Sequence, residues 1–255
     1  MTLRIAALIA IVAAVVGCTQ ESGGAPATSS SAIAAAPRGG TISPGQWRAV
    51  LIAGDNNSPA FDNGIDALRD KLAARGLRDI RTLTSDPGRN PSAQVASAAN
   101  VSQALRGSAG EACLVFVTSH GDERGVVLKA ANGILNPGTL DNALDAGCGT
   151  RPTVVVVSAC HSGVFLTPGM RQSNRIVLTA AAADRVSFGC GAGDRYTYYD
   201  QCLLQQFDGA STWNDLAQAT RARVANLEQR MGIRRPSQPQ VFIGQSVADL
   251  RIPGR

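Results

Sequence analysis

The sequence has few aromatic residues, and its positive charge is spread along the chain. Of 255 residues 4% are Phe, Trp or Tyr, and the net charge of +5 comes from scattered arginines. No lysine-rich block or basic and aromatic stripe is present, which argues against a nucleic-acid-binding surface. No Gly-x-Gly-x-x-Gly or Gly-x-x-x-x-Gly-Lys motif follows a strand-like run, so a nucleotide-binding fold would lack its phosphate cradle.

The N-terminal segment has the pattern of an export signal. Arg4 precedes an apolar run over residues 5–16, which is too short for a comfortable transmembrane helix and ends in Val-Val-Gly-Cys18. This ending resembles the lipobox of bacterial lipoproteins, and the resemblance implies that Cys18 is acylated. The alternatives are an uncleaved anchor, or an ordinary signal peptide with an incidental cysteine.

The chain is long enough for one buried domain plus this segment. We expect a signal peptide over 1–17, a flexible tether rich in Ser, Ala, Gly and Pro over 18–41, and one domain over 42–255. The expected location is the bacterial cell envelope, with the membrane contacted through the lipid. Thr19 stands where an Asp would retain the lipoprotein at the inner membrane, which favours an outer membrane and a domain facing the periplasm.

Export to an oxidising compartment permits disulfides. Besides Cys18 the chain has five cysteines, so at least one thiol stays free: Cys113, Cys148, Cys160, Cys190 and Cys202. Two bridges with one free nucleophile fit this number, and so do five reduced thiols.

Short apolar runs alternate with helical patterns along the domain. Strands are predicted at 47–53, 80–83, 113–118, 152–158, 176–180 and 240–243. Helices are predicted at 65–77, 94–105, 140–146 and 213–231, with a hairpin over 125–135 and Ser211 or Thr212 as the last N-cap. This alternation predicts a mostly parallel six-stranded sheet with helices on both faces, and functional groups at the carboxyl ends of its strands.

The domain has only two histidines, and both follow buried strands. His120 lies in Ser-His-Gly-Asp after one strand, and His161 follows Cys160 in Ala-Cys-His-Ser-Gly after another. An imidazole can take the proton of a nearby thiol and make it a nucleophile. His120 is the better base for Cys160, because a ring adjacent in sequence cannot usually swing back over the thiol. Gly121 leaves room for its backbone N–H to meet an oxyanion, together with the N–H of Cys160.

An apolar strand with His-Gly, then an apolar strand ending in Ala-Cys, is similar to the catalytic signature of the caspase-like cysteine peptidases. The resemblance covers about residues 47–243 and implies a caspase-like three-layer sandwich. Segments 179–190 and 196–199 resemble the legumain-type (C13) family, whose corresponding loop lines the S1 pocket. The segment Cys-His-Ser-Gly also resembles metacaspases, but the match to legumains extends beyond the pair His120 and Cys160.

The resemblance implies an endopeptidase that hydrolyses peptides or proteins through a thioester on Cys160, without a metal or organic cofactor. It assigns substrate contacts to Asp62, Asn63, Ser158, Ser187 and Phe188. Legumains carry Arg-His in the place of Asp62-Asn63, and Glu in the place of Ser158. This change of charge leads to the hypothesis that Asp62 favours a basic P1 residue; alternatively, Asp62 caps a helix beginning near Gly64.

Two other classes of protein fit parts of the pattern. One is a non-catalytic caspase-like lipoprotein that binds peptides or partners, although such a module needs neither His120 nor Cys160. The other is a structural lipoprotein with Cys160 in a disulfide.

Overall fold

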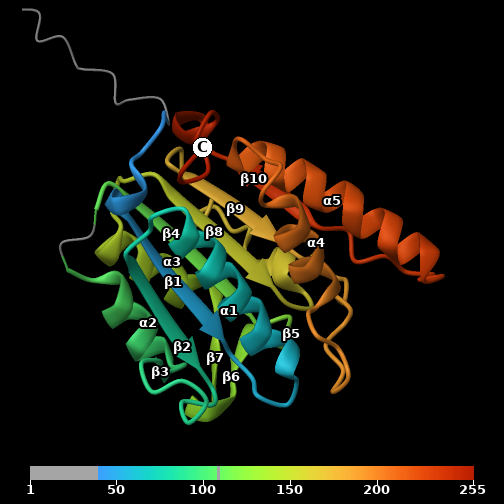
Figure 1. Cartoon of the computed structure of the whole chain (residues 1–255). Helices are drawn as coiled ribbons and strands as arrows, with labels where there is room; N and C mark the ends of the chain where they lie inside the picture. Colours follow the sequence, from blue (N-terminus) through green and yellow to red (C-terminus); the bar gives the residue numbers. More distant parts are fainter. Residues whose placement is uncertain (1–39, 108–109) are drawn as a thin grey trace, which may run out of the picture. The chain divides into compact units, whose positions relative to one another are not determined.

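The computed structural model describes residues 40–107 and 110–255. Its main sheet has seven strands in the order β10-β9-β8-β4-β1-β2-β3 (Figure 1). Their bounds are β1 Trp47–Ala53, β2 Asp79–Thr84, β3 Gln94–Val95, β4 Ala112–Thr118, β8 Thr153–Ser158, β9 Arg175–Thr179 and β10 Gln240–Ile243. All neighbouring pairs are parallel except β9 and β10. The predicted mostly parallel α/β sheet is therefore confirmed.

The predicted number of six strands is wrong, because the two-residue strand β3 adds a seventh at one edge. Its residues Gln94 and Val95 pair with Leu83 and Thr84 of β2, and both are exposed. The sequence pattern placed them in the following helix. That helix begins later, because the Ser97 side chain accepts the Asn100 N–H and caps it.

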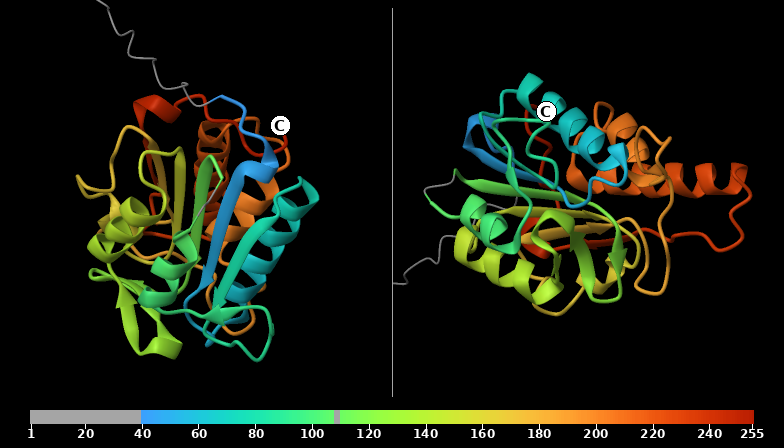
Figure 2. Two further views of the ribbon diagram at one scale, coloured as in Figure 1. Left: turned by 90° about the vertical axis from the view of Figure 1, so that its left-hand side faces the viewer. Right: turned by 90° about the horizontal axis from the view of Figure 1, so that it is seen from below.

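Five helices cover the sheet in the described part of the chain. They are α1 Pro59–Ala74, α2 Ala98–Leu105, α3 Pro137–Gly147, α4 Tyr198–Gln206 and α5 Trp213–Arg230. Helices α1, α4 and α5 pack with alternate strand residues such as Leu51 and Phe116 in one core. Helices α2 and α3 pack with the intervening residues, such as Ile52 and Val117, in a second core on the opposite face (Figure 2). The three-layer arrangement follows from this alternation, since successive strand side chains point to opposite faces.

The predicted hairpin is confirmed and belongs to a small antiparallel sheet. Its strands are β5 Gly121–Asp122, β6 Gly125–Leu128 and β7 Gly133–Leu135. Asn132 turns the chain in the left-handed region at φ 49°. The Val127 N–H donates to the His120 carbonyl at 2.9 Å, so the hairpin packs directly on the loop that carries His120.

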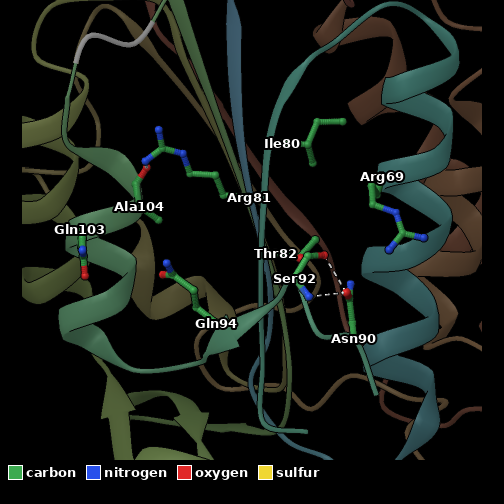
Figure 3. A pocket seen from close by; sticks show the side chains of 9 residues that line it. All are labelled: Arg69, Ile80, Arg81, Thr82, Asn90, Ser92, Gln94, Gln103 and Ala104. Carbon is green, nitrogen blue, oxygen red and sulfur yellow. Dashed lines mark hydrogen bonds between the residues drawn. The ribbon is translucent and has the colours of Figure 1, made fainter. Parts of the chain in front are cut away.

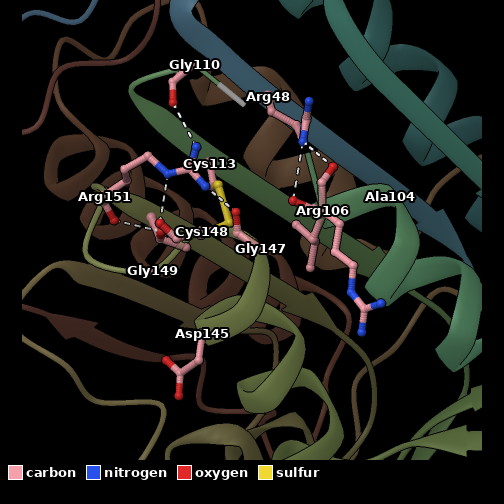
Figure 4. Close-up of a disulfide and its surroundings, with 12 residues drawn as sticks. Arg48, Ala104, Arg106, Gly110, Cys113, Asp145, Gly147, Cys148, Gly149 and Arg151 are labelled. Carbon is pink, nitrogen blue, oxygen red and sulfur yellow. Dashed lines mark hydrogen bonds between the residues drawn. A yellow bond between two sulfur atoms is a disulfide. The ribbon is translucent and has the colours of Figure 1, made fainter. Parts of the chain in front are cut away.

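One disulfide joins strand β4 to the end of helix α3, on the face of the sheet that α2 and α3 cover. Cys113 of β4 is bonded to Cys148, which follows α3, and both are buried (Figure 4). Arg151 donates to the carbonyl of Gly110 at 3.0 Å and to that of Cys148, which ties the same corner together. Cys160, Cys190 and Cys202 are free. The domain thus has one disulfide and three free thiols. The structure shows neither of the two alternatives considered from the sequence, which were two disulfides with one free thiol, or five free thiols.

Signal-peptide residues 1–17, Cys18 and the tether up to residue 39 lie outside the described residues. Within the part that the structure describes, no helix combines the length and apolar character needed to cross a membrane.

Candidate active site

Two neighbouring parallel strands bring the predicted dyad to one edge of the sheet. Thr118 of β4 lies opposite Ser158 of β8, and the Ser119 N–H donates to the Ser158 carbonyl at 3.1 Å. His120 and Cys160 each follow two residues beyond this pair, so both emerge at the same carboxyl edge. Both are partly buried and line one narrow cavity of about 10 Å³. The lining residues are Phe61, Ser119, His120, Ser158, Ala159, Cys160, Ser187, Phe188, Cys190 and Thr197.

Gly121 allows the loops that carry His120 and Cys160 to approach closely. A Cβ atom at this position would lie 2.5 Å from the carbonyl oxygen of Cys160 and 2.9 Å from the Cβ of Ala159. Any side chain at residue 121 would therefore push the His-Gly loop away from Cys160. The glycine is required by packing, and the same closeness places its backbone beside Cys160.

The sulfur of Cys160 faces a backbone donor from the loop after β9. The Ser187 N–H donates to Sγ at 3.2 Å, and Sγ lies 3.5 Å from the Ser187 carbonyl oxygen. A backbone N–H directed at the sulfur stabilises negative charge there, which a nucleophilic thiolate requires. The structural alternative in which Cys160 forms a disulfide is not the arrangement seen, because the thiol is free.

The two histidines have different environments. The His120 ring packs edge-on against the buried Phe61 ring of α1, with centroids 5.1 Å apart and planes at 81°. His161 has a left-handed backbone at φ 57°, and its Nδ1 donates to the Ala183 carbonyl at 2.8 Å. His161 does not line the cavity. The arrangement therefore leaves His120 as the imidazole that shares a cavity with Cys160.

A buried carboxyl group lies near the cavity and joins the ends of β4 and β8. Asp200 of α4 is fully buried, and its Oδ2 accepts the Thr118 hydroxyl at 2.7 Å. Its backbone N–H donates to the Thr197 hydroxyl, which lies 3.3 Å from that of Ser158. Burial raises the pKa of Asp200 to about 6, while the hydroxyls of Ser158, Thr118 and Thr197 oppose the shift. No sequence prediction included this residue.

The predicted pocket residues Ser187 and Phe188 do line the cavity. Phe188 lies beside the Tyr198 ring at 6.2 Å between centroids, and its carbonyl accepts the Tyr198 N–H at 2.9 Å. Gly189 follows with φ +82°, where a Cβ would lie 2.5 Å from Cδ1 of Tyr198. A glycine is needed at this turn, which sets Cys190 against the cavity.

Asp62 is not among the residues that line the cavity. It lies in α1, where its Oδ1 accepts the Thr84 hydroxyl at 2.6 Å, and burial raises the pKa of its carboxyl. The alternative role as a cap for a helix near Gly64 is wrong, because α1 begins at Pro59 and Ser58 is its N-cap. Asp62 instead joins α1 to β2.

Asn63 lies beside Asp62 and is also not among the residues that line the cavity. Its side-chain amide donates to the Arg195 carbonyl at 3.0 Å and accepts from Arg89 at 2.8 Å. These contacts connect α1 to the loop before α4, through Arg195, and to the segment between β2 and β3, through Arg89. The structure thus brings together Ser158, Ser187 and Phe188 with the dyad, but does not bring Asp62 or Asn63 to them.

A larger hollow of about 530 Å³ lies at the β2 edge of the sheet (Figure 3). It is lined by Arg69, Ile80, Arg81, Thr82, Asn90, Ser92, Gln94, Gln103 and Ala104. Both arginines make ion pairs, with Asp66 and Asp79 among their partners. No Cys, His, Asp or Glu is among the residues that line this hollow, so the smaller cavity with His120 and Cys160 is the candidate active site. In residues 40–107 and 110–255 no three His, Cys, Asp or Glu side chains are grouped to hold a metal.

Comparison with known proteins agrees with this fold. A crystal structure of caspase-1 from Spodoptera frugiperda superimposes with a TM-score of 0.60 at 14% identity, covering 82% of this chain and 90% of that chain. The comparison with curated proteins finds no match. The chain therefore has a caspase fold.

The family model described as the Peptidase C13 family matches residues 92–231, more than half of the chain. The chain belongs to the peptidase C13 family. The resemblance drawn from the His-Gly and Ala-Cys motifs is confirmed at this level, and a protease-type hydrolase acting on peptides or proteins follows from it.

Proposed function

We propose that the protein is a cysteine endopeptidase with Cys160 as nucleophile and His120 as its base. The observation that carries the proposal is that His120 and Cys160 line the same cavity. Each lies two residues after the paired strand ends Thr118 and Ser158, so both lie at one edge of the sheet. The Cys160 thiolate attacks the peptide carbonyl carbon, and the N–H groups of Gly121 and Cys160 stabilise the oxyanion. His120 protonates the leaving amine, and water then hydrolyses the thioester.

The environment around the dyad supports these roles. Phe61 restricts the imidazole of His120, and the Ser187 N–H contacts the sulfur. The cavity also presents the hydroxyls of Ser158 and Thr197, with Asp200 behind them. The hypothesis of a basic P1 preference was based on Asp62, which does not line the cavity, so no direct contact of Asp62 with P1 supports it. Fluorogenic peptides that differ only at P1 test it, and equal cleavage after Arg, Asn and Asp would contradict it.

The proposal is tested with Cys160→Ala and His120→Ala in the full chain. Each change should lower kcat/KM for a fluorogenic peptide by about 10³-fold or more, because nucleophile and base act as a unit. Cys202→Ala and His161→Ala are the matched controls, because Cys202 is buried in the core and His161 does not line the cavity. Thermal unfolding establishes that each variant is folded. Hydrolysis that persists in folded Cys160→Ala would reject the mechanism.

We also propose that the peptidase is held at the bacterial envelope by a lipid on Cys18. The lipobox-like ending Val-Val-Gly-Cys and the Ser/Ala/Gly/Pro-rich tether after it support this location. A disulfide in the domain is consistent with an oxidising compartment.

A further inference from the structure

A second free thiol lines the candidate active site. Of the three free cysteines, Cys202 is buried in the core, at 1% exposure, whereas Cys160 and Cys190 are partly buried and line the same narrow cavity. A cysteine-peptidase mechanism uses one sulfur, so the Cys190 thiol has no part in the proposed hydrolysis. Its position beside the nucleophile calls for a separate explanation.

The two sulfurs are close enough to influence each other electrostatically. Burial raises the pKa of the Cys190 thiol, and the negative charge on Cys160 raises it further. Cys190 is therefore held as a thiol while Cys160 faces a backbone N–H donor. A nucleophilic sulfur with a neutral thiol beside it is the arrangement of a reactive cysteine and a resolving cysteine.

The loop that carries Cys190 already contacts the nucleophile. Ser187, three residues earlier, makes its backbone contacts with Sγ of Cys160. Cys190 lies between Gly189 and Gly191, in the irregular segment between β9 and α4. Glycines on both sides permit backbone conformations that other residues rarely adopt, which widens the choice of geometries for the Cα separation that a disulfide requires.

We propose that Cys190 is a resolving thiol that protects Cys160 by forming a reversible disulfide with it after oxidation by a peroxide. The Cys160 thiolate attacks one oxygen of hydrogen peroxide, the O–O bond breaks, and sulfenic acid and hydroxide form; a proton converts the hydroxide to water. The Cys190 sulfur then attacks Sγ of Cys160, loses its proton, and displaces the sulfenic oxygen as a second water. Two thiols are oxidised and one peroxide is reduced.

The disulfide removes the nucleophile and thus stops hydrolysis until a dithiol reduces it. It also prevents further oxidation of Cys160 to sulfinic and sulfonic acids, which thiols do not reverse. This regulation rests on the proposed function, since it concerns the same sulfur. Its chemistry can be measured without a substrate.

The experiment treats the purified full chain with hydrogen peroxide, blocks free thiols, and maps tryptic peptides by mass spectrometry. In the wild type we expect the Val186–Arg195 peptide to be linked to the peptide over residues 130–171, which contains both Cys148 and Cys160 because trypsin does not cleave before Pro152. This link should remove two hydrogens in addition to those lost in the Cys113–Cys148 bond, and it should separate with dithiothreitol, after which Cys160 alkylates again. Cys202→Ser is the control and should give the same link.

Cys190→Ser should give no link, and its Cys160 should accumulate sulfinic and sulfonic acid that dithiothreitol does not recover. The inference is overturned if wild-type Cys160 is oxidised without the link, or if Cys160 recovers equally in Cys190→Ser. A link in a protein that hydrolyses no peptide would leave the redox inference standing and remove the proposed function. Peptide hydrolysis by a protein that forms no Cys160–Cys190 link would support the proposed function and overturn the redox inference.

Discussion

At the scale of single residues, Asp200 carries more of the site than its position in the sequence suggests. Its carboxyl is fully buried and accepts from Thr118, two residues before His120. Through Thr197 it is connected to Ser158, two residues before Cys160. Its other oxygen, Oδ1, has no hydrogen-bond partner among the described residues. Ionising a carboxyl group in this buried setting costs free energy. The contribution of Asp200 to the stability of the folded protein therefore depends on pH.

The pH dependence of stability has a definite sign for Asp200. Its pKa rises on folding from the ordinary value of 3.8 to about 6, so its stabilising contribution is complete below 3.8 and lost as pH rises through about 6. Asp200→Asn removes this titration. Between pH 4 and 7, the free energy of unfolding of the variant should therefore fall less than that of the wild type. Denaturant unfolding at several pH values measures the difference.

Asp208→Asn is the control for this comparison, because Lys71 and Arg75 hold the pKa of exposed Asp208 below its usual range. It should not flatten the curve between pH 4 and 7. Parallel curves for wild type and Asp200→Asn would show that Asp200 does not titrate in this window.

At the scale of elements, most long strands and helices could be predicted because their periodicity is local. The runs at Trp47–Ala53 and Gln240–Ile243 end where β1 and β10 end. Strand β3 was missed because two exposed residues carry no periodicity. Helix α4 was missed because its segment was interpreted as pocket loop, although Tyr199, Cys202 and Leu203 have helical spacing and Thr197 is an N-cap.

The start of α5 offers a test of local capping. Two candidates, Ser211 and Thr212, stood before this helix, and the structure assigns the cap to Thr212. Its hydroxyl accepts the Asp215 N–H at 3.0 Å, and the Asp215 carboxylate accepts the Thr212 N–H at 3.0 Å. Thr212→Ala should lower the free energy of unfolding by about 1 kcal/mol. Chemical denaturation measures this loss.

Ser211→Ala is the matched control, because Ser211 is exposed and only its backbone carbonyl is bonded, to the Ile252 N–H. Its effect should stay within roughly 0.5 kcal/mol. Equal losses in the two variants would contradict the assignment of the cap.

At the scale of the whole molecule, the proposed envelope location depends on Cys18. In a bacterial host, the full-length chain should incorporate a labelled fatty acid and sediment with membranes. Cys18→Ser should lose the label, because the acceptor sulfur is gone. Cys202→Ser should keep the label. Labelled Cys18→Ser would contradict lipidation at this residue, whereas an unlabelled but membrane-bound variant would indicate an uncleaved apolar anchor.

The sequence by itself determined the α/β class, the strands that carry the dyad, and the shared edge of His120 and Cys160. These features follow from spacing within one element and from the rule that parallel strands present their carboxyl ends together. Gly121 was also identified, because a glycine beside the base has a direct chemical use.

Only the tertiary structure decided which distant side chains meet. Folding places Cys190 and Asp200 at the dyad and directs Asp62 to Thr84, although Asp62 had been expected in the pocket. It also pairs Cys113 with Cys148 and leaves three thiols free. Such contacts depend on how helices pack across the sheet and how the loop after β9 closes over Cys160. No local pattern of residues encodes these distances.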